Sequence, residues 1–213
     1  MFKDKPWLTE FSSVLKIIYF YNVHIELKEK QLKILDVAIE LFKEKGFVGT
    51  SMRDIAARLD IKAASLYAHI RSKDELLEWI SFSTAEKFFA GLNQVKDANV
   101  PAQEKLDLFI EKHLQTVLEN PDVTNIYSNE WKHLDASLDR FVLLRKQYQQ
   151  EVESLLEAIF TELERPLESS KFTSRFLLHT LNNSYYWIKS GSEPTSKVIS
   201  QIKEKVLFGL IGK

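Results

Sequence analysis

The chain has 213 residues, 45% of them hydrophobic, which is enough to bury the core of one domain or of two small ones. Its formal net charge is −1, so bulk charge gives no argument for nucleic-acid binding. The absence of cysteine excludes disulfides, thiolate catalysis and cysteine-based zinc sites, and it fits a reducing cytoplasm. Six glycines and five prolines suit long helices and disfavour a sheet-rich fold.

Residues 1–26 form an N-terminal extension ahead of the first regular helical pattern. Val14 to Ile25 is apolar, aromatic and β-branched, yet too short to span a bilayer and without a small-residue cleavage site. Three interpretations stay open: a membrane-surface segment, an extra helix packed on the body, or an upstream start that is not the native one. The last is our preferred hypothesis, because the motif described below begins only near Glu26.

The pattern from Lys28 to Lys45 predicts an amphipathic helix. Lys and Glu occupy one face, and apolar residues recur at helical spacing on the other: Leu32, Leu35, Ala38, Ile39 and Phe42. Gly46 is placed to end this helix, since glycine tolerates positive φ. We expect Phe47 to pack beneath the two helices that follow.

Two short helices joined by a tight turn are predicted between Thr50 and Lys73. Ser51 is an N-cap residue with Asp54 three positions later, an imperfect capping box because Glu or Gln is usual there. The first helix has an apolar face of Ile55, Ala56 and Leu59, and it ends at a turn formed by Asp60 and Ile61.

The second short helix is predicted from Ala63 to Ile70. Leu66 and Ile70, four positions apart, face the core, while small residues surround the N-terminal end of the helix. A small-faced helix end with polar neighbours fits a DNA major groove. Apolar spacing alone would be weak support, because short helix pairs occur in many helical proteins.

One set of residues runs through this region with fixed spacing: Ile34, Leu35, Ala38, Leu41, Phe42, Gly46, Phe47, Thr50, Ser51, Ile55, Ala56, Leu66, Tyr67, His69, Ser72, Lys73, Leu76 and Leu77. In this spacing, the segment from Leu35 to Leu77 resembles the DNA-binding domain of the tetracycline-repressor family of bacterial regulators. The departures are Asp60 in place of the turn glycine, Ile70 in place of Phe, and the stretch from Lys62 to Ala64. The stretch from Lys62 to Ala64 lies on the base-reading surface, so its changes affect which operator sequence is recognised and not the mode of DNA binding.

The resemblance, together with side-chain chemistry, assigns two sets of DNA contacts. The set expected on the phosphate backbone is Thr50, Ser51, Arg53, Tyr67, His69 and Lys73. The set expected on base edges is Lys62, Ala63 and Ser65. A purely structural role stays open for Ser51, as a cap, and for Tyr67, as part of the core. The region holds ten Lys and Arg against nine Asp and Glu from Lys28 to Ile80, so positive potential must come from local clustering at Lys62, Arg71 and Lys73.

The remainder of the chain predicts further helices. Their expected bounds are Ser72–Asn93, Ala102–Glu119, Val123–Leu134, Ser137–Glu162, Ser170–Ser190 and Ser196–Leu210, with breaks at Pro121, Pro166 and Gly191. The predicted fold class is all-α, with a three-helix helix-turn-helix DNA-binding domain at residues 27–88. Residues 89–213 are expected to form a helical effector-binding and dimerisation domain.

Aromatic residues and a few amides in this second domain predict a ligand pocket between helices. The candidate lining is Phe88, Phe109, His113, Tyr127, Trp131, Phe141, Arg145, Tyr148, Asn183, Tyr186 and Trp187. Ordinary core packing is the alternative for each of them. The stretch from Asn129 to Tyr148 and the run from Asn183 to Gly191 also resemble, more weakly, family members that sense acyl-coenzyme A. Arg140, Arg145 and Lys146 are candidates to meet a phosphate-bearing ligand at the pocket mouth.

These patterns predict a cytoplasmic, homodimeric, ligand-responsive repressor that binds a near-palindromic operator. The resemblance implies pairing through the last two helices and release by a small lipophilic or acyl-coenzyme A effector. We expect no enzyme activity, cofactor, metal or membrane partner, since the five histidines are scattered and no catalytic motif is present. Glu111 with His113, or Glu130 with His133, would bind metal only if two helices converge. The alternatives are a helical ligand-binding or interaction protein without sequence-specific DNA binding, and a non-specific DNA binder.

Overall fold

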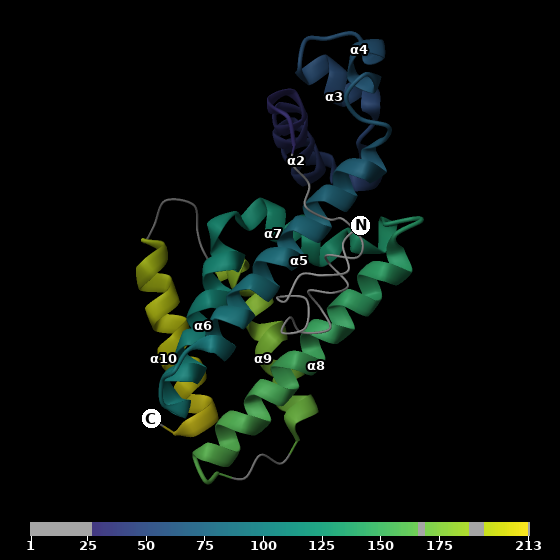
Figure 1. Ribbon diagram of the computed structural model, residues 1–213. Coiled ribbons are helices and arrows are strands. Elements are labelled where there is room, and N and C mark those ends of the chain that lie inside the picture. The colour runs from purple at the N-terminus through teal and green to yellow at the C-terminus, as the bar shows by residue number, and fades with distance from the viewer. Residues whose placement is uncertain (1–26, 166–168, 188–193, 213) are drawn as a thin grey trace.

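The computed structural model describes residues 27–165, 169–187 and 194–212, and every regular element within them is helical. The N-terminal extension and the expected breaks at Pro166 and Gly191 lie outside these residues. Three helices form a head at one end of the molecule: α2 (Glu29–Gly49), α3 (Met52–Arg58) and α4 (Ala63–Tyr67) (Figure 1). Helix α5 (Lys73–Asp97) runs from this head into a larger helical body (Figure 1). The prediction of an all-α fold is confirmed.

Gly46 bends the chain where the first predicted helix was expected to end. Its φ is 74° and its ψ is 164°, which interrupts α2 within the range Glu29–Gly49. Phe47, directly after the bend, is buried and meets Phe42 edge-on, with 5.2 Å between ring centroids. The predicted break at Gly46 and the burial of Phe47 are confirmed, but among the described residues the ring and cation contacts of Phe47 are with Phe42, His133 and Lys73 and not with the two short helices of the head.

The two short helices of the head are present, but the second is shorter than predicted. Helix α4 ends at Tyr67, with Ala68 as its C-cap, and does not continue to Ile70. Leu66 and Ile70 nevertheless both face the core, as predicted. Asp60, in the turn between α3 and α4, has a φ of 53°, a value that glycine adopts more readily than aspartate.

Helix α5 is longer than predicted, and only one of the two hydrogen bonds of the expected capping box forms at its N-terminus. The Ser72 hydroxyl accepts from the Glu75 backbone N–H at 3.3 Å, but the Glu75 carboxylate accepts from the Arg71 backbone N–H at 2.6 Å instead of returning to Ser72. The C-terminal end extends to Asp97 because fully buried Val95 continues the apolar stripe.

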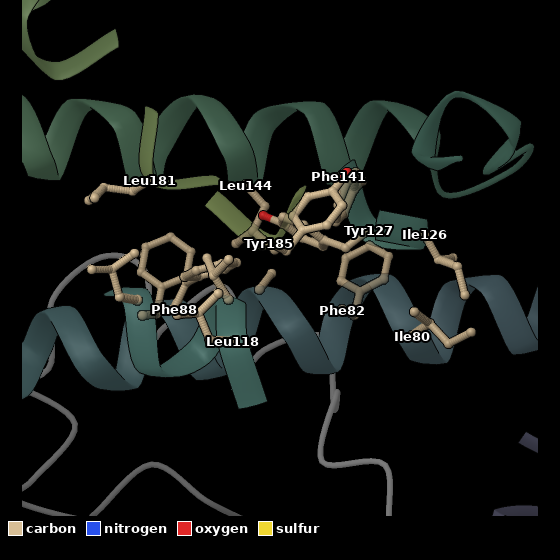
Figure 2. Close-up of a cluster of buried hydrophobic side chains, with 14 of the residues drawn as sticks. Ile80, Phe82, Phe88, Leu118, Ile126, Tyr127, Phe141, Leu144, Leu181 and Tyr185 are labelled. Atoms are coloured by element: carbon tan, nitrogen blue, oxygen red, sulfur yellow. The ribbon is translucent and has the colours of Figure 1, made fainter. Parts of the chain in front are cut away.

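The body is built from the remaining helical elements. They are α6 (Ala102–Glu119), α7 (Pro121–Asn129), the 3₁₀ turn η2 (Trp131–His133), α8 (Leu138–Glu162), α9 (Ser170–Asn182), the 3₁₀ turn η3 (Ser184–Trp187) and α10 (Thr195–Ile211). The core lies where α5, α7 and α8 converge, and Figure 2 shows Phe82, Tyr127 and Phe141 meeting there. None of the described helices is long and apolar enough to cross a membrane.

Two predicted continuous helices are interrupted in the structure. The segment expected to be helical from Ser170 to Ser190 ends as an α-helix at Asn182. Past that point the Asn183 amide donates back to the His179 carbonyl at 2.8 Å, and the Ser184 hydroxyl donates to the Leu181 carbonyl at 2.7 Å. Such short polar side chains compete with the helical backbone pattern. The segment expected from Val123 to Leu134 is likewise divided between α7 and η2.

Candidate DNA-binding and effector sites

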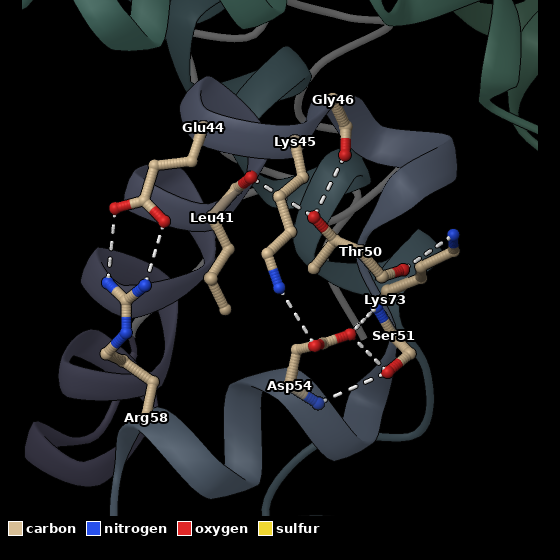
Figure 3. A network of polar contacts seen from close by, with 9 residues as sticks. All are labelled: Leu41, Glu44, Lys45, Gly46, Thr50, Ser51, Asp54, Arg58 and Lys73. Atoms are coloured by element: carbon tan, nitrogen blue, oxygen red, sulfur yellow. Dashed lines mark hydrogen bonds and ion pairs between the residues drawn. The ribbon is translucent and has the colours of Figure 1, made fainter.

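Thr50 links the head helices and does not present its hydroxyl to DNA. The side chain is 2% exposed, and its hydroxyl lies 2.9 Å from the Gly46 carbonyl and 3.2 Å from the Leu41 carbonyl. Figure 3 shows Thr50 turned toward α2 between these two residues. The predicted phosphate contact through this hydroxyl is therefore corrected: the group is already bonded and is shielded from solvent.

Ser51 and Asp54 form the capping box at the start of α3, as predicted. Asp54 accepts from the Ser51 backbone N–H at 2.8 Å, and the Ser51 hydroxyl accepts from the Asp54 N–H at 3.2 Å. Hydrogen bonds from Ser51 and Lys45 hold the pKa of Asp54 well below its usual range. Ser51 remains exposed, but its backbone N–H and its hydroxyl both donate to the Asp54 carboxylate, so the predicted phosphate contact at Ser51 would have to displace Asp54.

Lys73 is a structural link in addition to being a predicted phosphate contact. Its ammonium donates to the Phe47 carbonyl at 2.8 Å and to the Thr50 carbonyl at 3.0 Å, and it lies 4.4 Å from the centroid of the Phe47 ring. These contacts hold the start of α5 against the junction of α2 and α3. The sequence suggested only an exposed cation at a helix start, because both acceptors are backbone atoms more than 20 residues away.

The surface of α4 is formed by small and polar residues around one exposed tyrosine. Tyr67 is 56% exposed, so the alternative of a core role for this ring is wrong. Ala63 is partly buried against the core, whereas the outward residues are Lys62, Ala64, Ser65, Tyr67 and Ala68. Ala64 and Ala68 were absent from the predicted contact set. Their exposure follows from the shortness of α4, which leaves Leu66 as its one fully buried residue.

Two predicted cations of the head are available to a ligand. The exposed side chains of Arg53 and Lys62 have no hydrogen bond or ion pair with the part of the chain that the structure describes. Arg58 and Arg71, in contrast, pair with Glu44 at 2.8 Å and Glu75 at 3.1 Å. His69 is half-buried and its carbonyl accepts from the Gln31 side chain at 3.1 Å, which ties the end of α4 to α2.

A second candidate site is a cleft of about 540 Å³ between α8 and α9. Its lining is Tyr127, Arg145, Lys146, Tyr148, Gln149, Gln150, Glu153, Lys171, Arg175, Leu178, His179 and Asn182. Four of these are cations and one is an anion, so the cleft favours an anionic ligand. The volume lies within the range of small-molecule sites.

The closed end of the cleft is a hydrogen-bonded chain of three side chains. His113 from α6 is 3% exposed, with its Nδ1 3.0 Å from the Tyr148 hydroxyl and its Nε2 2.9 Å from the Asn182 Oδ1. Burial lowers the pKa of His113 to about 4, against a smaller opposing effect of the Asn182 hydrogen bond, so the ring is neutral at pH 7. Because the Asn182 oxygen can only accept, His113 Nε2 carries the proton and Nδ1 accepts from Tyr148.

Only part of the predicted ligand set lines this cleft. Tyr127, Arg145 and Tyr148 do, whereas Phe88, Phe109 and Phe141 are buried in the packed interior behind them. His113 touches the cleft only through its partners. The Arg145 guanidinium covers the Trp131 ring, 5.1 Å from the centroid.

Two further predicted residues lie elsewhere. Asn183 bonds back onto α9, and Tyr186 projects outward with 62% exposure, so the expectation that they line the same pocket is corrected. The side chain of Trp187 lies outside what the structure describes. Arg140 is also withdrawn from the pocket mouth, because it pairs with Glu78 at 2.6 Å and lies over the Phe82 ring at 4.1 Å.

Sequence reasoning missed the α9 wall of the cleft. Its residues recur at helical spacing along one face: Lys171, Arg175, Leu178, His179 and Asn182. This periodicity is visible in the sequence, but the predicted lining was based on aromatic residues and did not include this face of α9. Among the described residues there is also no cluster of three or more His, Asp or Glu side chains suited to a metal ion.

The head and its attachment define a class of protein: a helix-turn-helix DNA-binding domain joined to a larger helical body. Comparison with known proteins agrees. The profile of bacterial regulatory proteins of the tetR family matches residues 34–80, and that of the tetracyclin repressor-like C-terminal domain matches residues 99–210. The chain belongs to the tetR family of bacterial regulatory proteins and is a DNA-binding transcriptional regulator, not an enzyme.

Individual relatives agree over most of the chain. It is 27% identical over 190 residues to the HTH-type transcriptional repressor KstR2 of Rhodococcus jostii strain RHA1, covering 85% of this chain and 91% of the relative. The structure of KstR2 from Mycobacterium tuberculosis superposes with a TM-score of 0.78 at 23% identity, covering 86% and 96%. The structure of AibR in complex with isovaleryl coenzyme A and operator DNA has a TM-score of 0.71 at 23% identity, covering 83% and 95%.

Proposed function

We propose that the protein is a homodimeric repressor that binds a near-palindromic operator and leaves it when an acyl-coenzyme A thioester, or a related anionic lipophile, occupies the α8–α9 cleft. The repressor role is supported by relatives that are named repressors. The observation that carries DNA binding is the outward face of α4, where Tyr67 and Lys62 flank small residues on a rigid scaffold. Small side chains allow a helix to approach base edges, and Lys62 can donate to guanine.

Proposed roles at the DNA divide by the availability of each side chain. Lys62, Ala64 and Ser65 would face bases, while Arg53 and Tyr67 would contact phosphates. His69 would contribute from the end of α4. Lys73 would contact a phosphate only with the one proton that its two backbone acceptors leave free.

The proposed dimer uses α9 and α10. Phe172 and Phe176 are 70% and 56% exposed and stack on one another, with 6.4 Å between ring centroids. A groove beside them is lined by Phe176, Val198, Ile202, Val206 and Leu210, among others. Phe208 adds a third exposed ring. Burying such apolar area in a second copy is favourable, and a two-fold axis would place two α4 helices on major-groove turns about 34 Å apart.

We propose that α5 couples effector binding in the cleft to the position of the DNA-binding head. Phe88 and Phe89 on this helix lie 5.8 and 5.1 Å from the Tyr148 ring, which closes the cleft. The other end of α5 carries Lys73, which holds the head. A ligand that displaces Tyr148 would therefore move α5 and change the spacing of the two heads in the dimer. The size of the response equals the difference in ligand affinity between the two states.

The direct test is an electrophoretic shift with DNA from upstream of the gene, compared with random DNA at several salt concentrations. Preference for a palindromic fragment that survives rising salt supports an operator-binding repressor. Equal, steeply salt-sensitive shifts of both DNAs would instead indicate a non-specific binder. No shift of either would indicate a helical ligand-binding protein.

A further inference from the structure

The two ends of the effector cleft are lined by side chains of different chemistry. Ser170 lies 2.6 Å from Glu157 and Ser174 lies 3.4 Å from Glu153, so α8 and α9 run antiparallel. Lys171 and Arg175 therefore lie toward one end, while Asn182 lies at the other with Tyr127 and Tyr148. From Lys171 to Asn182 the cleft wall is about 16 Å long, at roughly 1.5 Å per helical residue.

The cations allow a ligand with several phosphates. Lys146, Lys171 and Arg175 are exposed at the cleft and have no hydrogen bond or ion pair to the described residues. Lys171 and Arg175 lie at one end, whereas the antiparallel register of α8 and α9 places Lys146 near Asn182. Glu153, the one acidic lining residue, is engaged by Gln149 at 2.7 Å and by Ser174. Neutral donors leave the charge of Glu153 in place, but Lys171 and Arg175 outnumber it, so the net charge of the lining residues at this end is positive.

The closed end offers a single fixed donor. The Asn182 oxygen accepts from His113 Nε2 at 2.9 Å, which leaves the amide NH₂ of Asn182 without a hydrogen bond among the described residues. The Tyr148 hydroxyl proton is directed to His113 Nδ1 at 3.0 Å, so the Tyr148 oxygen can only accept from a ligand. In this arrangement neutral His113 holds the Asn182 oxygen through Nε2–H, and the Asn182 NH₂ faces the cleft. The reverse orientation of the amide would require the other neutral tautomer of His113, with Nδ1–H donating to the Tyr148 oxygen.

We infer that Asn182 recognises a carbonyl oxygen of the effector, with His113 as the positioning residue that orients its amide. This deepens the proposed function and rests on it: the ligand is a thioester whose carbonyl accepts from the Asn182 NH₂, while its phosphates lie toward Lys171 and Arg175. An acyl group bearing a hydrogen-bond donor beside the carbonyl would also meet the Tyr148 oxygen. A ligand with a methylene in place of the carbonyl would leave the Asn182 donor unpaired in a partly buried site, which weakens binding.

The test uses two probes that differ in one oxygen: isovaleryl-coenzyme A and its thioether analogue, in which CH₂ replaces the carbonyl. Calorimetric titration of the full-length protein should give about fivefold tighter binding of the thioester, the value expected for one neutral hydrogen bond. Both probes carry the same charge, so their affinity ratio is insensitive to the cations. In Asn182→Ala the ratio should fall to about one. The neighbouring Asn183→Ala should retain it, because Asn183 does not line the cleft and its amide is bonded to the His179 carbonyl.

A second variant covers the case in which Asn182→Ala does not fold. Asn182→Asp keeps the size and the acceptor for His113 but removes the donor, so it should also abolish the thioester preference. The inference is overturned if wild-type protein binds both probes equally, or if either foldable Asn182 variant keeps the wild-type ratio. If wild-type protein binds neither probe, the proposed coenzyme A effector is wrong and this inference with it. Binding without thioester preference contradicts only the role of Asn182.

Discussion

Helix α4 and the α8–α9 cleft place their functional side chains by different means. In α4, neighbouring residues divide between core and surface, with Leu66 fully buried and Tyr67 56% exposed. In the cleft, the closed end combines His113 from α6, Tyr148 from α8 and Asn182 from α9, which are up to 69 residues apart. The head is thus specified largely by local spacing, whereas the cleft depends on how whole helices pack. A single substitution should accordingly separate stability from function in the head more cleanly than in the body.

The largest expected effect tests this division at adjacent positions. Leu66→Ala should lower the free energy of unfolding by about 3 kcal/mol, since it removes a fully buried side chain. Tyr67→Ala should change stability by less than about 1 kcal/mol but weaken operator binding at least tenfold. Urea denaturation and fluorescence anisotropy with labelled operator measure the two quantities. Equal loss of stability in both variants would remove the distinction between scaffold and surface.

The cleft is expected to make stability depend on pH. The pKa of His113 is lowered from 6.5 to about 4 by burial, so between these values the unfolded chain binds a proton that the native protein excludes. The contribution of His113 to stability should therefore be intact above about pH 6.5 and decline toward pH 4, by up to about 3 kcal/mol. Denaturation of wild type and His113→Gln across this range measures it.

The quantity to compare between the two proteins is the slope of the free energy of unfolding against pH, and not its absolute value. His113→Gln can be less stable at every pH and still lack the decline between pH 6.5 and 4. Parallel curves for the two proteins would show that His113 is not a buried neutral group. The hydrogen-bonded chain that orients Asn182 would then be incorrect.

Substitution of Lys73 tests whether this residue stabilises the junction between head and body or only contacts DNA phosphate. Lys73→Ala removes two hydrogen bonds to backbone carbonyls and the contact with Phe47, so it should destabilise the protein by about 2 kcal/mol without DNA present. Arg53→Ala, at an exposed cation without a partner among the described residues, is the matched control and should leave the melting temperature unchanged. If Lys73→Ala weakens operator binding while the melting temperature stays constant, Lys73 is only a phosphate contact.

The smallest expected effect concerns the turn between α3 and α4. Asp60 has a φ of 53°, at the position where the family pattern has glycine. Asp60→Gly should therefore stabilise the protein by about 0.5–1 kcal/mol, because glycine adopts this conformation without a Cβ clash. Thermal denaturation measures the gain. A loss of stability would indicate that the Asp60 side chain compensates for the strain.

The sequence was sufficient for the features that local chemistry determines. The Ser51 cap, the bend at Gly46, the inward faces of Leu66 and Ile70 and the all-α fold were all predicted. The break after Asn182 was not, because it depends on short polar side chains returning to their own backbone in competition with the helix.

For the site residues too, features that depend on contacts between distant segments were not predicted. The inward turn of the Thr50 hydroxyl and the backbone acceptors of Lys73 depend on contacts between segments that the pattern does not relate. In the body, aromatic content indicated a pocket, but much of it fills the core. The cleft wall is instead polar and cationic, and Asn182 becomes significant only once His113 is placed against it.

The central claim is that a ligand in the body releases DNA from the head. Fluorescence anisotropy of a labelled operator complex, titrated with isovaleryl-coenzyme A, tests it most directly. The expected result is release of the DNA by wild-type protein, with a higher ligand concentration needed for Arg175→Glu, which reverses one cleft charge while leaving α4 intact. If calorimetry shows that the ligand binds and the operator complex remains unchanged, the proposed connection between cleft and head is contradicted.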